Sequence, residues 1–158
     1  MERTVVTTVV RHVEDADLTV QADIPADWSE LTADGYVLVA GGRMDGETET
    51  MAPVLQVTLR RAADADAVWQ TVRSAAAELP EGEVAFEARR PTDGGEEAVL
   101  EVVHLSAVTG GTQVSILRTV FLADRSLTLS VVGTCGGGAS PETRDALRRI
   151  IASVQVQP

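Results

Sequence analysis

The sequence contains no lysine, so all 13 of its basic residues are arginines. Without lysine the chain cannot form the usual phosphate-binding loop, and neither glycine fingerprint of a nucleotide-binding turn is present. Acidic residues number 24, which gives a net charge of −11. Because a field of this sign repels phosphate backbones and anionic lipid, we expect no nucleic-acid partner and no acidic membrane surface.

Cysteine occurs once, at Cys135, which excludes an intramolecular disulfide. With only two histidines there is no Cys/His cluster for zinc, and the acidic stretch 45–49 does not follow the order of a calcium loop. We therefore expect no metal and no cofactor. No apolar run approaches the roughly 20 residues that cross a bilayer, and no signal-peptide core follows Met1. The expectation is a cytoplasmic protein without membrane insertion.

Aromatic residues make up only 3% of a chain that is 44% hydrophobic. The core must therefore consist mainly of Val, Leu, Ile and Ala, a composition typical of sheets because β-branched side chains suit a pleated surface. The length of 158 residues, without repeats or linkers, predicts one domain over residues 1–158. The missing lysine, together with abundant Ala, Gly, Val and Asp, indicates GC-rich coding and an actinobacterial source.

Alternation of apolar and polar residues predicts strands over residues 3–13, 18–24, 36–40, 54–59, 84–89, 98–105, 112–122 and 127–133. The last four are separated by short turns at 91–95, 109–111 and 124–125. Parallel neighbours would need connections of a dozen or more residues, so these four strands form an antiparallel meander.

Two helices are predicted. Asp64 or Asp66 caps the first, which ends at Pro80, and Trp69 lies beside its apolar stripe of Val68, Val72, Ala75, Ala76 and Leu79. Ser140 and Pro141 begin the second, whose apolar face carries Leu147, Ile150, Ile151 and Val154. The fold class is therefore α+β, a mostly antiparallel sheet of about six or seven strands with helices packed on it.

The order of these elements resembles the PsbP/Mog-like superfold, and within it the actinobacterial LpqN-type lipoproteins. The residues that carry the resemblance are 24–29, 35–41, 51–59 and 151–154, and the likeness covers residues 18–156. The chain departs from the lipoprotein pattern by lacking a lipobox cysteine and by adding a strand over residues 3–13. The resemblance implies a domain that binds another protein, such as a small GTPase or a photosystem subunit, and is not an enzyme.

Trp28 is the strongest single candidate for a binding residue, because exposed tryptophans anchor many protein interfaces. The alternative is that Trp28 covers the edge of the core after the strand-ending Pro25. Together with Tyr36 and Arg43, these residues form the predicted binding set, on a surface built from residues 25–35 and 41–53. The expected function is a non-catalytic adaptor or chaperone-like domain, linked to secretion or envelope machinery, whose protein partner and oligomeric state stay open.

Several alternatives remain. Cys135 with His104 would be a cysteine nucleophile and its base, and the sheet and helices would otherwise enclose a small apolar ligand as a carrier. The glycine-rich run 133–138 is either a flexible connection or an anion site at a helix start. The arginine pairs at 60–61, 89–90 and 148–149 either clamp a carboxylate or phosphate or balance an acidic surface.

Overall fold

The computed structural model describes residues 5–43, 52–106 and 108–157, so the acidic stretch 45–49 lies outside the described residues. The first half contains β1 (Val6–Val13), η1 (Glu14–Ala16), β2 (Leu18–Pro25), β3 (Ser29–Leu31), β4 (Leu38–Gly41), β5 (Val54–Arg61) and α1 (Ala65–Glu78). The second half contains β6 (Glu83–Thr92), β7 (Gly95–Leu105), β8 (Thr112–Leu122), η2 (Ala123–Arg125), β9 (Leu127–Gly136), α2 (Pro141–Ser153) and β10 (Gln155–Gln157).

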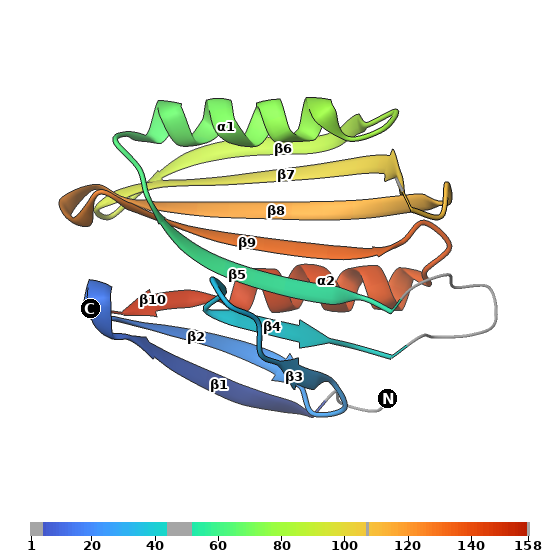
Figure 1. The fold of residues 1–158 in the computed structure, drawn as a ribbon, viewed down its shortest axis with the longest axis horizontal. Coiled ribbons are helices and arrows are strands. Elements are labelled where there is room, and N and C mark those ends of the chain that lie inside the picture. Colours follow the sequence, from blue (N-terminus) through green and yellow to red (C-terminus); the bar gives the residue numbers. More distant parts are fainter. Residues whose placement is uncertain (1–4, 44–51, 107, 158) are drawn as a thin grey trace.

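The strands form two antiparallel sheets. Seven lie in the order β3-β4-β5-β9-β8-β7-β6, and three lie in the order β1-β2-β10 (Figure 1). The fold class is thus confirmed as α+β with a seven-stranded antiparallel sheet, two helices and an additional small sheet. The meander of β6, β7, β8 and β9 is also confirmed, with each strand paired to the next along the chain.

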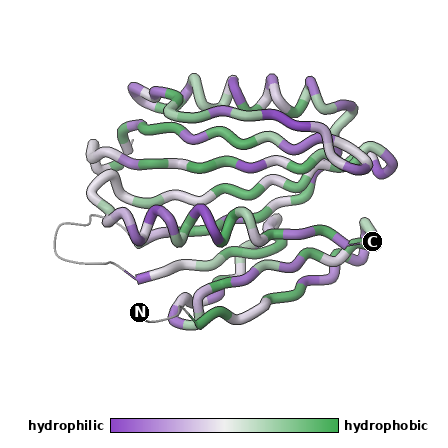
Figure 2. Tube along the Cα trace, turned by 180° about the vertical axis from the view of Figure 1, so that it is seen from behind, coloured by the Kyte–Doolittle hydropathy of each residue, from purple (hydrophilic) through white to green (hydrophobic). Residues whose placement is uncertain are grey.

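The large sheet is covered differently on its two faces. Leu100 packs in a cluster with Trp69 of α1, whereas its neighbour Val99 packs against the main core, which contains Leu147 of α2. Because successive strand residues point to opposite faces, α1 and α2 lie on opposite sides of the sheet. The three-stranded sheet adds Val20 and Ile24 to the α2 side. Hydrophobic and hydrophilic residues accordingly alternate along the strands (Figure 2).

The helix caps follow the sequence. Asp64 accepts a hydrogen bond from the amide of Ala67 at 2.7 Å, and Ser140 accepts one from the amide of Thr143 at 3.2 Å. These side chains satisfy amides that have no partner within the helix. Pro141 occupies the first turn of α2, as predicted. Neither helix of the described ranges has the length and hydrophobicity to span a membrane.

Only the end of the glycine-rich run connects β9 to α2, because Gly133 to Gly136 belong to β9. A side-chain carbon on Gly133 would lie 2.6 Å from Ile151 Cδ1 and 2.8 Å from Leu147 Cδ1. Glycine is therefore needed at this point of the strand so that α2 can approach the sheet closely.

Several boundaries differ from the sequence prediction. The short strands β3 and β10 were not predicted, since three residues carry too little periodicity. The strand predicted over 84–89 extends to Thr92 and includes Pro91, which the prediction assigned to a turn. Proline fits there because β6 is an edge strand, whose outer side makes no ladder hydrogen bonds. Trp69 is buried with Ala76 in the packed face of α1 and does not lie beside it.

One guanidinium group joins the large sheet to α2. Arg118 of β8 forms an ion pair with Glu97 of β7 at 3.1 Å, and both side chains are largely buried. Its Nη1 atom donates to the carbonyl of Ile151 at 3.1 Å and to that of Val154 at 2.7 Å. The carbonyl of Ile151 also accepts a long bond of 3.4 Å from the amide of the C-cap residue Val154, so Arg118 adds a second donor there and fixes the end of α2 on the sheet.

We expect Arg118→Met to lower the free energy of unfolding by about 3 kcal/mol, because it leaves the carboxylate of Glu97 buried without this partner. Urea denaturation followed by circular dichroism measures the change. Arg149→Met, the same substitution at an exposed position of α2, is the matched control and should change the free energy by less than about 0.5 kcal/mol. Equal stability of the two variants would show that the contacts of Arg118 do not stabilise the fold.

The pH dependence of stability tests the ion pair of Arg118 and Glu97 through the titration of Glu97. Burial acts to raise the pKa of Glu97, but the hydrogen bond from Arg90 and the charge of Arg118 outweigh it and lower the pKa below its ordinary value of 4.5. The unfolded chain therefore binds a proton at Glu97 more readily than the folded chain does. The contribution of Glu97 to the free energy of unfolding is present above pH 4.5 and is lost as the pH falls through the lower, folded-state pKa. The stability difference between wild type and Glu97→Gln should therefore shrink from pH 7 to about pH 3. A difference that grows on acidification would contradict this assignment.

Candidate functional site

Trp28 covers one end of the main core. Its indole is half-buried against that core, and its amide donates to the carbonyl of the buried Pro25 at 3.0 Å. Gly42 lies directly against the indole, because a side-chain carbon there would come within 2.6 Å of Trp28 Cε2. This packing agrees with the alternative in which Trp28 seals the core edge. A role for Trp28 as an interface anchor stays a prediction.

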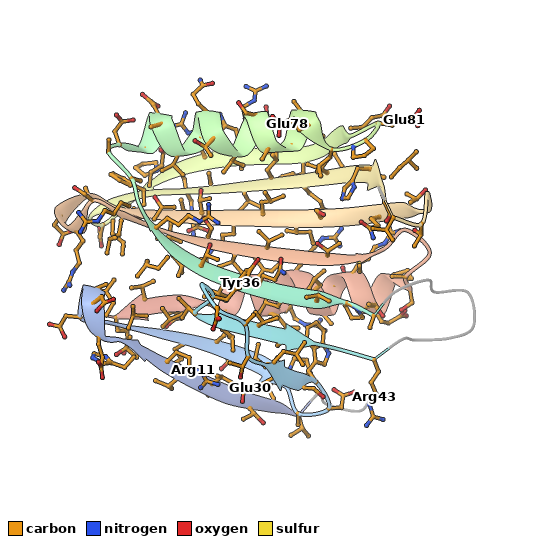
Figure 3. The ribbon with its side chains drawn as sticks, in the orientation of Figure 1. Arg11, Glu30, Tyr36, Arg43, Glu78 and Glu81 are labelled. Atoms are coloured by element: carbon orange, nitrogen blue, oxygen red, sulfur yellow. The ribbon has the colours of Figure 1, made fainter. Side chains whose placement is uncertain are left out.

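Tyr36 and Arg43 lie at opposite ends of β4 (Figure 3). Seven residues of nearly extended chain place them on the order of 20 Å apart. Arg43 is exposed and follows Gly42, so it lies near Trp28, whereas Tyr36 is 42% exposed at the other end. The structure therefore places Pro25, Trp28 and Arg43 near one another and Tyr36 at the other end of β4.

Tyr36 lines an open hollow of about 1400 Å³ at the end of the molecule where the β1–β2 and β8–β9 turns meet the end of β5. Both turns have the same construction, a 3₁₀ helix followed by a residue in the left-handed region, Asp17 or Ser126, each with φ of 50°. Arg125 of η2 donates to the carbonyl of Ala16 at 2.6 Å. This bond joins the two turns, which form one wall of the hollow. We call the hollow the end hollow.

The arginine pairs of the sequence behave differently from one another. Arg89 and Arg148 form ion pairs of 2.6 to 2.9 Å, with the acidic side chains of Asp66, Glu96, Glu101 and Asp145. Hydrogen bonds to Glu96 and to Glu101 raise the pKa of Arg89 and of Arg148, respectively. Charge balance therefore accounts for these two residues. Arg90 likewise pairs with an acid, at 2.8 Å.

Arg60 and Arg61 differ, because they are exposed and have no hydrogen-bond or ion-pair partner in the described part of the chain. Both line the end hollow. Arg11 also lines it but forms an ion pair with Glu30 of β3 (Figure 3). The exposed acids of the end hollow are Glu14, Asp15 and Asp124, so its lining carries both signs of charge.

A second opening is a groove of about 460 Å³ between α1 and the large sheet. The predicted apolar stripe of α1 is only partly used for packing, since Trp69 and Ala76 are buried whereas Val68 and Ala75 line the groove. The helix contributes a mainly apolar wall. β8 and β9 contribute Leu117, Thr119, Thr128, Ser130 and Val132, and β5 and its continuation contribute Thr58 and residues 60–63, which also line the end hollow. We call this opening the α1 groove.

Thr128 is the unusual residue of the α1 groove. Its side chain is 4% exposed, and its hydroxyl oxygen has no hydrogen-bond partner in the described part of the molecule. In the sheet register Thr128 stands opposite Arg60 of β5, so both side chains project from the same face at the same level. The sequence did not single out Thr128, because its pairing with β5 joins segments far apart in the chain.

Cys135 and His104 do not come together. His104 lies on the α1 side of the sheet, where its Nε2 atom is 2.8 Å from the hydroxyl of Ser115. Cys135 pairs with Val114, the residue before Ser115, and is fully buried in the main core on the α2 side. The sheet itself therefore separates the sulfur from the imidazole. The described residues also contain no group of three or more His, Cys, Asp or Glu side chains that could hold a metal ion.

No family model matches the sequence, and no curated protein matches it in sequence. The arrangement of sheets and helices, however, has counterparts among solved structures. The Ran-binding protein Mog1p of Saccharomyces cerevisiae has a TM-score of 0.63 at 13% identity, over 97% of this chain and 96% of that chain. The chain has the Mog1/PsbP-like fold.

Two further structures share the Mog1/PsbP-like fold. LpqN of Mycobacterium tuberculosis, a protein involved in cell envelope biogenesis, has a TM-score of 0.73 at 16% identity, over 99% of this chain and 93% of that one. The cyanobacterial PsbP protein of Synechocystis has a TM-score of 0.62 at 12% identity, over 99% and 95% of the two chains. At these low sequence identities the structural similarity shows the fold alone. It confirms the resemblance to this fold that was inferred from the sequence.

The hydroxyl of Thr128 gives a direct test of the α1 groove in the unliganded protein. Thr128→Val keeps the shape of the side chain and removes a buried oxygen that has no partner. We expect the free energy of unfolding to rise by about 1 kcal/mol, because desolvation of that oxygen is no longer required. Thr119→Val on β8 is the neighbouring comparison, since its hydroxyl is not among the fully buried oxygens that lack a hydrogen bond. A stability loss in Thr128→Val would mean that the hydroxyl has a partner in solution.

Proposed function

We propose that this protein is a non-catalytic binding module that recognises another protein through the end hollow. The observation that carries the proposal is one open end of the molecule where the exposed Tyr36 lies with Arg60 and Arg61, which have no acidic partners within the described ranges. Tyrosine and arginine are enriched among the residues that dominate binding energy.

The solved structures with this fold support a role in binding. Mog1p is a Ran-binding protein, and LpqN is involved in cell envelope biogenesis. By analogy, we infer an adaptor or chaperone-like role, with the envelope or secretion machinery as its setting. Fold similarity alone does not identify a partner. The proposal therefore rests on the end hollow, and the analogy only narrows the setting in which a partner is sought.

The position of Cys135 supports a non-catalytic function. A cysteine nucleophile needs an accessible sulfur and a nearby base, and Cys135 lies in the core on the opposite face of the sheet from His104. The proposal therefore assigns binding, and not turnover, to this chain.

The arginines define what the partner must offer. A guanidinium group binds carboxylates through two parallel hydrogen bonds, so the partner contributes acidic side chains to Arg60 or Arg61 and an apolar group to the ring of Tyr36. Because these arginines are exposed, salt screens the contact, and the complex should weaken as ionic strength rises.

The test is a pull-down from a lysate of the source organism, with wild type beside Tyr36→Ala and Arg61→Ala. Arg149→Ala removes the same charge from an exposed position of α2 and is the matched control. The captured protein is then purified, and its Kd is measured by calorimetry. We expect Tyr36→Ala to weaken binding roughly thirtyfold, and Arg149→Ala to leave it unchanged.

Two outcomes would contradict the proposal. The first is a partner that binds Tyr36→Ala and Arg61→Ala as tightly as wild type. The second is a partner whose affinity drops for Trp28→Ala in a protein that stays folded, which would move the interface to the other end of β4.

A further inference from the structure

The α1 groove adjoins the end hollow, since residues 60–63 line both, but most of its other lining is apolar or uncharged. Its volume of about 460 Å³ falls within the range of small-molecule sites, and a binding site of that kind combines apolar walls with a few polar groups. Val68, Val72 and Ala75 supply an apolar wall from α1, and Leu117 and Val132 add apolar surface from the sheet.

The polar groups converge at one end of the groove. Arg60 and Thr128 are direct neighbours across β5 and β9. The hydroxyl of Thr128 is buried without a hydrogen-bond partner, and the guanidinium of Arg60 has no acidic partner in the described part of the protein. Thr128 lines the groove although its hydroxyl oxygen is itself almost wholly buried, so a groove ligand completes this hydroxyl once the side chain rotates toward the groove.

The first turn of α1 adds to this end of the groove. Ala67 and Val68 line it, and the amino end of a helix carries partial positive charge. The two acids near this turn already have partners: Asp64 accepts from the amide of Ala67, and Asp66 pairs with Arg89 at 2.8 Å. The guanidinium of Arg60 and the helix end therefore favour an anion here, against the carboxylate of Asp64, whose charge the amide does not neutralise.

We propose that the α1 groove binds a small amphipathic carboxylate, with the carboxylate at Arg60 and Thr128 and the apolar tail along Val68, Val72 and Val132. Arg60 and Thr128 both donate hydrogen bonds, and a carboxylate accepts two or more at once. A cation would be repelled by Arg60, and a fully apolar ligand would leave the hydroxyl of Thr128 without a partner. Inorganic phosphate would make no use of the apolar wall.

The experiment titrates sodium decanoate into the ¹⁵N-labelled protein and follows amide chemical shifts. Saturable shifts at Val68, Val72 and Val132 are expected. Arg60→Ala should weaken decanoate binding roughly tenfold or more, and Thr128→Val several-fold to about tenfold, because each removes a hydrogen bond to a charged group. Decan-1-ol, which has the same chain without the charge, should bind at least about tenfold more weakly than decanoate.

Tyr36→Ala and Arg149→Ala serve as controls, since neither residue lines the α1 groove. Both should bind decanoate like wild type, which separates this site from the part of the end hollow around Tyr36. Amide spectra of each variant establish that it is folded. The proposal is overturned if decanoate shifts do not saturate, if they lie away from α1 and β9, or if folded Arg60→Ala and Thr128→Val both bind with unchanged affinity. Equal affinity for decan-1-ol would overturn the role of the carboxylate.

Discussion

The contact between Arg118 and the end of α2 is the interaction on which the arrangement of layers depends. The guanidinium is anchored by Glu97 within the large sheet, and it holds carbonyls of the last turn of α2. Since β10 follows α2 after one residue and pairs with β2, the position of that last turn also sets the position of the small sheet. One buried charge therefore couples helix, large sheet and small sheet.

Local features could be predicted from the sequence, and long-range pairings could not. Short turns fixed the meander, and Asp64 and Ser140 marked the helix starts, because those signals act over a few residues. The pairing of β5 with β9 joins segments about seventy residues apart along the sequence, and no local pattern specifies it. The first part of the glycine run was not recognised as strand for the same reason, since Gly133 is determined by contact with α2 and not by its neighbours in the chain.

The candidate sites follow the same division. Tyr36 and the Arg60–Arg61 pair were visible as residue types, but only the fold shows which arginines have acidic partners. Thr128 gave no sequence signal, because a threonine in a strand is ordinary until its neighbours are known. The separation of Cys135 from His104 likewise follows from the alternation of side chains between the two faces of the sheet, one covered by α1 and the other by α2. The candidate sites of this molecule are assembled from distant segments of the chain.

The edges of the large sheet have a consequence for the behaviour of the protein at high concentration. An outer strand presents unpaired amides and carbonyls that can recruit another copy, and fibres grow by repeating that step. At β6 the register is interrupted between Val84 and Phe86, and Pro91 removes one amide donor. At the opposite edge, β3 is only three residues long. Both edges are thus poor templates, so this sheet resists open-ended self-assembly although Phe86 is half exposed.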